Sequence, residues 1–155
     1  MFSKIDWDNI KSGVPVNFHG DLHFENIIKN KNNFKLLDWR EDFAGITKYG
    51  DLYYDLAKIN HGFIIDHKLI NKNNFKIEQI NKNKVNLNYK QTLSNKKCKK
   101  IFYEFLKDKK ISIMKVELIT ALIYLNIAPL HHYPYSLFLY YLGKFELNRV
   151  IKKYI

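Results

Sequence analysis

Hydrophobic and polar positions divide the chain into a front part with short apolar runs and a back part with helical spacing. Residues 16–18, 27–28 and 34–37 are apolar runs of strand length. The polar stretch 29–33 lies between the second and third runs, and its Asn residues tolerate left-handed backbone geometry. The pattern therefore predicts a short strand over 16–18 and, beyond it, a β-hairpin over 27–37.

A helix is expected after the loop that follows this hairpin. Residues 39–49 include a glycine and read as that loop. Asp51 is a favourable N-cap, and positions 52, 55, 56 and 59 share one helical face. The helix is expected to end near His61, because a glycine such as Gly62 commonly terminates helices.

The back part of the chain predicts one further hairpin and then helices. Apolar and polar residues alternate over 85–90, so residues 75–80 and 85–93 are expected to pair around a turn. From residue 94 the apolar positions recur at helical spacing, with a break at the prolines of 129–134 and a last helix over 135–151. The expected core stripes of the first two helices are Ile101, Phe102, Phe105 and Leu106, then Val116, Ile119, Thr120, Ile123 and Ile127.

Together these elements predict an α+β, mainly helical fold in one domain of 155 residues. The formal net charge is +11, almost entirely from lysine, and it favours contact with polyanions, although most of it reads as a solvated surface. The single Cys98 cannot form an internal disulfide, and the N-terminus lacks the apolar run of a signal peptide. A cytoplasmic location is expected. Polar residues and prolines interrupt the apolar stretch 118–142, which therefore predicts core helices and no membrane span.

The candidate chemistry lies in the front part, where two apolar runs bracket four polar side chains. His19, Asp21 and Asn26 belong to the first run, and Asp38 follows the predicted hairpin. Asp21 can orient a hydroxyl nucleophile and accept its proton. Because the hairpin brings its two ends together, the Asn26 carbonyl and the Asp38 carboxylate can share a Mg²⁺ ion that also binds a nucleotide triphosphate. The constellation therefore suits phosphoryl transfer.

At these positions the sequence His-Gly-Asp-x-x-x-x-Asn, followed by Leu-Leu-Asp-Trp, resembles the signature of the aminoglycoside phosphotransferase and choline kinase family. These small-molecule kinases have a protein-kinase-like fold, and the step from Asp21 to Asn26 matches the protein-kinase catalytic loop. The resemblance implies that Asp21 is the catalytic base, that Asn26 and Asp38 bind Mg²⁺, and that His19 shapes the catalytic loop. It also implies ATP as the phosphoryl donor.

The resemblance extends to Gly-Asp-Leu-Tyr-Tyr-Asp-Leu-Ala at 50–57, which is similar to the next landmark of the family and implies a loop-supporting role for Asp55. It covers residues 16–58 well. Residues 1–15 are then a lead-in, residues 75–93 a hairpin that either covers the acceptor site or merely decorates the lobe, and residues 94–155 the helical remainder. The acceptor is expected to be a small-molecule hydroxyl on an amino alcohol, a sugar or an aminoglycoside-like compound.

The clearest departure from the family is that only 18 residues precede His19. A kinase-like enzyme carries an N-terminal lobe there, with a phosphate-covering loop, a strand-borne Lys and its partner Glu. The chain is therefore expected to be a C-terminal lobe whose N-terminal lobe is absent or resides on a separate chain, through truncation or splitting. Weak or no kinase activity is expected of the lobe alone.

Two other functions fit the sequence less well. A non-catalytic remnant that acts as a binding module would not need Asp21, Asn26 and Asp38 together. A basic nucleic-acid-binding domain is expected to interleave exposed aromatics with Lys and Arg on one element, whereas the only dense basic run, 96–100, leads into an apolar helix.

Overall fold

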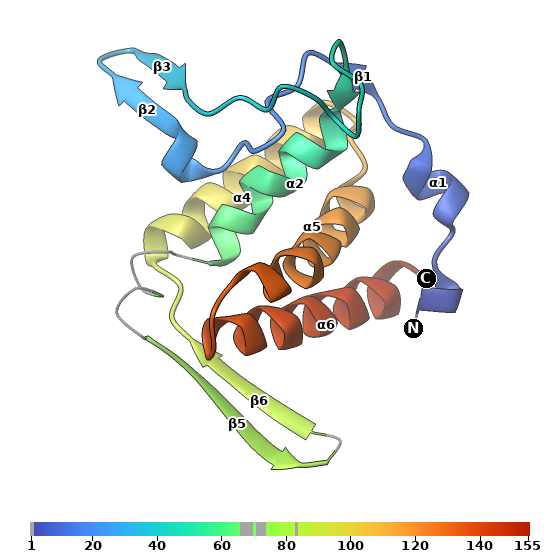
Figure 1. The fold of residues 1–155 in the computed structure, drawn as a ribbon, viewed down its shortest axis with the longest axis vertical. Helices are drawn as coiled ribbons and strands as arrows, with labels where there is room; N and C mark the ends of the chain where they lie inside the picture. The colour runs from blue at the N-terminus through green and yellow to red at the C-terminus, as the bar shows by residue number, and fades with distance from the viewer. Residues whose placement is uncertain (1, 66–69, 71–73, 83) are drawn as a thin grey trace.

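The computed structural model describes residues 2–65, 70, 74–82 and 84–155. Short elements make up the front part and run around the outside of the longer helices (Figure 1). In chain order they are the 3₁₀ turn Phe2–Lys4, α1 (Trp7–Lys11), β1 (Pro15–Val16), the 3₁₀ turn Phe24–Asn26, β2 (Ile27–Asn30), β3 (Asn33–Leu36) and β4 (Gly50–Asp51).

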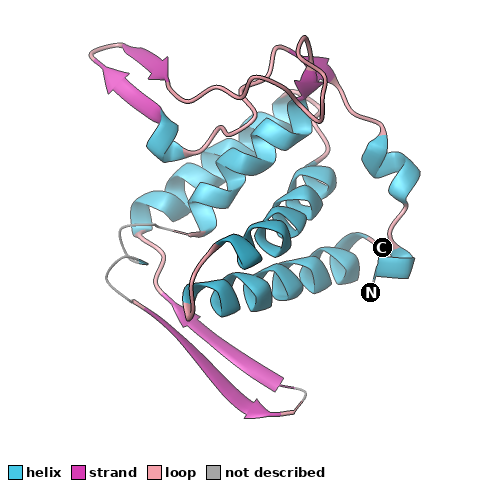
Figure 2. Ribbon diagram, viewed as in Figure 1, coloured by secondary structure: helices cyan, strands magenta, loops and turns pink. Residues whose placement is uncertain are grey.

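Longer elements make up the rest of the described chain. They are α2 (Leu52–Ile64), β5 (Phe75–Asn81), β6 (Lys84–Tyr89), α4 (Leu93–Asp108), α5 (Ile113–Ile127), the 3₁₀ turn Ala128–Leu130 and α6 (Tyr135–Tyr154). The strands form three separate two-stranded antiparallel sheets, β1–β4, β2–β3 and β5–β6. Figure 2 shows short strands in the β1–β4 and β2–β3 sheets and a longer β5–β6 hairpin that projects away from the helices. The protein is thus α+β and mainly helical, as the sequence predicts.

Both predicted hairpins are confirmed. In the first, Ile27 pairs with Leu36 and Asn30 with Asn33, and Lys31 in the turn adopts a left-handed φ of 53°. In the second, Phe75 pairs with Tyr89. The prediction that its second strand reaches residue 93 was wrong. The Thr92 hydroxyl accepts a hydrogen bond from the backbone N–H of Asn95 and so caps the start of α4.

The hydrophobic core centres on α5, which packs against α2 on one side and α6 on the other (Figure 1). Of the stripe predicted for α5, Val116, Thr120 and Ile123 are buried, whereas Ile119 and Ile127 are half-buried. Buried residues also lie on the other sides of the helix. The stripe predicted for α4 is only half right. Phe102 and Leu106 are buried, whereas Ile101 and Phe105 remain 64% and 46% exposed.

Two charged side chains of α5 are buried within this core, and both have partners. The Lys115 ammonium donates hydrogen bonds to the backbone carbonyls of Asn9 and Ser12 and so ties α1 to the core. The Glu117 carboxylate accepts a hydrogen bond from the Tyr103 hydroxyl at 2.9 Å and pairs with Arg149 at 3.2 Å. Burial raises the pKa of Glu117, but Arg149 and Tyr103 outweigh burial and keep that pKa below its usual value.

One segment of the described chain, Ile113–Leu130, is long and apolar enough to cross a membrane, and half of it is buried inside the protein. It consists of α5 and the short turn after it, and it contains the buried Lys115 and Glu117. The core position of α5 accounts for its apolar composition. That the chain has no membrane span stays a prediction.

The prediction that α2 ends near His61 was wrong, because the helix continues through Gly62 to Ile64. Gly62 is needed for packing. A Cβ atom at this position would lie 2.8 Å from the ring of Phe24, which packs edge-on against Phe63. The glycine therefore lets the 3₁₀ turn that contains Asn26 lie directly on α2.

Substitution of Gly62 by Ala tests this interpretation through a double-mutant cycle with Phe24→Ala. In the wild-type background Gly62→Ala should lower the free energy of unfolding by about 1–3 kcal/mol, because the added methyl group overpacks the contact. In the Phe24→Ala background the same change should raise it by about 0.5–1 kcal/mol, the normal benefit of alanine in a helix. Urea unfolding measures both values, and an equal effect in the two backgrounds would contradict the packing role.

Candidate functional site

The loop between β1 and the 3₁₀ turn Phe24–Asn26 is fastened to α2 by the Asp55 carboxylate. Its two oxygens accept hydrogen bonds from the backbone N–H of His19 at 2.7 Å and of Gly20 at 2.9 Å. Asp55 lies in the first turn of α2, whose N-cap is Asp51 as predicted. Since all of these groups are buried, the two hydrogen bonds replace contacts with water that the loop has lost.

The same loop passes very close to residues 39–40. Gly20 has a φ of 80°, and a Cβ atom there would lie 2.6 Å from the Cβ of Arg40. Only glycine therefore fits where the two segments pass each other. The His19 carbonyl accepts a hydrogen bond from the Arg40 backbone N–H at 2.9 Å, and the His19 ring packs against Trp39. The His19 Nδ1 atom accepts a further hydrogen bond from the Asp21 backbone N–H at 3.2 Å.

The Asp21 carboxylate is contacted by basic side chains from three parts of the chain. The Lys58 ammonium on α2 is 2.7 Å from Oδ1, while Arg40 and His23 approach Oδ2 at 3.4 and 3.5 Å. The Asp21 and Lys58 side chains are each only 13% exposed. Burial raises the pKa of Asp21, but the hydrogen bond and charge of Lys58, together with His23 and Arg40, outweigh it and hold that pKa below its usual value.

Asn26 lies beside this loop. Its side-chain amide N–H donates a hydrogen bond to the Asp21 backbone carbonyl at 3.0 Å, and its own backbone carbonyl accepts one from the Leu37 N–H at 2.9 Å. The β2–β3 register therefore brings the backbone of residue 26 next to residue 37, one position before Asp38.

Asp38 is exposed and has a left-handed φ of 57°. Such backbone is uncommon for a residue with a side chain, although Asp tolerates it better than most. Within the described part of the chain no hydrogen bond or ion pair engages its carboxylate, and no group of three His, Cys, Asp or Glu side chains is placed to hold a metal. The structure thus joins Asp21, Asn26, His19 and Asp55 through direct contacts. Asp38 lies outside this network of contacts.

Sequence reasoning missed Lys58 and Arg40, which both contact Asp21. Each left a signal in the sequence. Lys58 follows Asp55 by three residues, so both side chains emerge on one face of α2 toward the same loop. Arg40 is one of only two arginines in a chain otherwise supplied with lysine.

No protein-family model, curated protein or solved structure matches this chain.

Replacing Lys58 with Met should raise the pKa of Asp21, because burial then acts with fewer opposing charges. In the wild type the lowered pKa contributes stability above the unfolded value of about 3.9, and this contribution is lost as the pH falls through the lower folded value. The Lys58→Met variant should therefore lose less stability over the same fall in pH. Carbon-13 NMR of the Asp21 carboxyl group measures the pKa, with Lys29→Met on exposed β2 as the matched control. An unchanged Asp21 titration would contradict the assigned role of Lys58.

Proposed function

We propose that this chain is the catalytic lobe of an ATP-dependent phosphotransferase that acts on a small-molecule hydroxyl. The observation that carries the proposal is the direct contact network that joins Asp21, Asn26 and Asp55 around one buried loop. The spacing of these residues is the one that resembles the aminoglycoside phosphotransferase and choline kinase family. The helical fold is, in the same proposal, the C-terminal lobe of a protein-kinase-like fold.

Asn26 and Asp38 are the proposed ligands of Mg²⁺. The Asn26 side chain donates through nitrogen to the Asp21 carbonyl, which leaves its oxygen as the ligand atom. The strained backbone of Asp38 supports a functional role, because strain of this kind concentrates at binding and catalytic sites. One carboxylate and one amide suit Mg²⁺, which takes few protein ligands and completes its shell with phosphate and water. When bound, Mg²⁺ would neutralise phosphate charge.

Asp21 is proposed to orient the acceptor hydroxyl and accept its proton. Its Oδ2 atom, held only by long contacts to Arg40 and His23, is the oxygen that a hydroxyl can approach. The lowered pKa keeps the carboxylate ionised, which suits a reaction whose transition state needs positioning more than a strong base. Lys58 and Arg40 place positive charge where negative charge accumulates during phosphoryl transfer.

A separate N-terminal lobe is the proposed partner. Support comes from exposed apolar side chains on the segment that carries the site. Phe34 and Trp39 are 67% and 53% exposed, and the same segment exposes Phe24, Ile28, Leu37, Ile46 and Tyr49. Large apolar side chains that gather in one segment often mark a surface that another chain covers. The isolated lobe is proposed to have weak or no kinase activity, and its location is proposed to be cytoplasmic.

One observation favours the alternative of a non-catalytic binding module. Lys58 already occupies Oδ1 of Asp21 at 2.7 Å, and a carboxylate retained only for structure would form the same ion pair. The two proposals differ at Asn26 and Asp38, since only the kinase needs them for metal.

Paramagnetic broadening by Mn²⁺-ATP, with Mn²⁺ in place of Mg²⁺, tests the metal site without knowledge of the acceptor. We expect the amide signals of Asn26 and Asp38 to broaden most, and Asp38→Ala to weaken binding of Mn²⁺-ATP by about 10-fold or more, as loss of one charged ligand costs at least ~1.4 kcal/mol. Nuclear magnetic resonance of the full chain provides both measurements.

Two variants serve as controls. Asp42→Ala removes a nearby carboxylate that caps a turn at the Gly45 N–H, and it should leave the broadening unchanged. Asp21→Ala should retain metal–nucleotide binding. In an assembly that transfers phosphate, it should lower the reaction rate by about 10²–10⁴-fold, because the general base is lost. Broadening centred away from residues 26 and 38 would refute the kinase proposal and favour the binding module.

A further inference from the structure

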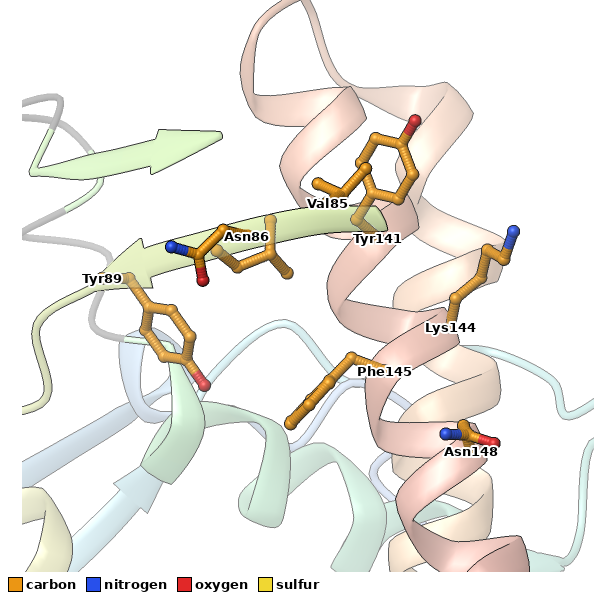
Figure 3. Close-up of a pocket in the computed structure, with 8 residues that line it drawn as sticks. Val85, Asn86, Tyr89, Tyr141, Lys144, Phe145 and Asn148 are labelled. Carbon is orange, nitrogen blue, oxygen red and sulfur yellow. The ribbon is translucent and has the colours of Figure 1, made fainter. Parts of the chain in front are cut away.

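A groove of about 650 Å³ lies between β6 and α6. Four residues of α6 line it at positions 141, 144, 145 and 148, a spacing that places them in one stripe along the helix. Strand β6 supplies the other wall with Val85, Asn86, Leu87 and Tyr89. Figure 3 shows that Phe145 extends from α6 toward the side of the groove on which Tyr89 lies. Pockets of this volume commonly hold a small ligand.

The groove wall contains an aromatic side chain that the core does not use. Phe145 is 58% exposed, whereas the next turns of α6 bury Leu142 and Leu147 completely. The Tyr89 ring packs edge-to-face against Phe138 of the core at 5.4 Å between centroids, so the exposed Phe145 ring is the face on which a flat ring can stack. Burial, with the nearby Glu146, raises the pKa of Tyr89 to about 12, so its hydroxyl remains a hydrogen-bond donor at neutral pH.

Among the residues that line the groove, Lys144 alone is charged. It contributes an ammonium group and Asn148 contributes an amide, whereas the Asn86 side chain is already hydrogen-bonded to Glu78 on the paired strand. The Lys144 ammonium rests 5.2 Å above the Tyr140 ring, and no carboxylate pairs with it within the residues that the structure describes. A ligand with an anionic group would therefore find a cation that no acidic partner already neutralises.

We propose that this groove binds a planar aromatic anion of the nucleoside monophosphate class. The ring stacks on Phe145 beside Tyr89, the Asn148 amide forms a hydrogen bond to its edge, and the phosphate pairs with Lys144. The groove lies against α6, while the loop of Asp21 lies on the far side of α2 (Figure 1). A ligand there cannot react at Asp21, so this site is separate from the proposed catalytic site and does not depend on it.

NMR titration of the full chain with AMP, adenosine and ribose 5-phosphate tests the proposal. AMP should shift the signals of residues 85–89 and 141–148. Adenosine lacks the anion and ribose 5-phosphate lacks the ring, so each should bind at least about 10-fold more weakly, the effect of losing one charge-assisted or stacking contact.

Variants of α6 separate the two contacts. Lys144→Met should reduce AMP affinity to that of adenosine, and Phe145→Ala should weaken both ligands by about 10-fold. Lys152→Met, on the same helix but outside the groove, should change neither. Retained dispersion of the amide spectrum shows that each variant is folded.

Three results would overturn the proposal. The first is that AMP shifts only signals around Asp21 and Lys58. The second is that AMP, adenosine and ribose 5-phosphate bind with equal affinity. The third is that the signals of the groove residues change with protein concentration when no nucleotide is present. The last result would assign the groove to a contact between two copies of the chain.

Discussion

The structure depends most on the Asp55 carboxylate, which accepts two buried backbone hydrogen bonds from His19 and Gly20. These bonds join a short irregular loop to a helix that is itself part of the core. One turn further along α2, Lys58 reaches the carboxylate of Asp21. A single helix face thus fixes both the backbone of the loop and the orientation of its charged side chain, and the β2–β3 hairpin then brings Asn26 against it.

Buried charges follow one rule throughout the described chain: each is held by a specific partner. Asp21 pairs with Lys58, Glu117 with Arg149, and Lys115 with backbone carbonyls of the N-terminal segment. Removing a charge from water is costly, so such groups persist only where partners compensate. In all three cases the partners lie far apart in sequence, which makes these contacts a means of fixing tertiary arrangement as well as charge balance.

Much of the fold follows from local sequence pattern. Both hairpins, the Asp51 cap, the central position of α5 and the Pro-bounded break before α6 could all be predicted, because each depends on residues close together in the chain. The packing role of Gly62 could not be predicted, because it depends on Phe24, a residue that lies beside Gly62 only in the folded chain. Likewise, the spacing of Asp21, Asn26 and Asp55 indicated one site, but the ion pairs with Lys58 and Arg40 depend on how α2 and the loop after β3 pack.

Hydrogen exchange at the His19 and Gly20 amides is the most direct test that Asp55 holds the loop of Asp21 in place. An asparagine at position 55 keeps the shape but offers only one acceptor oxygen, so at least one of the two amides loses its partner. In Asp55→Asn we expect protection of that amide to fall by about 10-fold or more, while amides of the central helix α5 keep theirs. Unchanged protection at both His19 and Gly20 would contradict this account of the site.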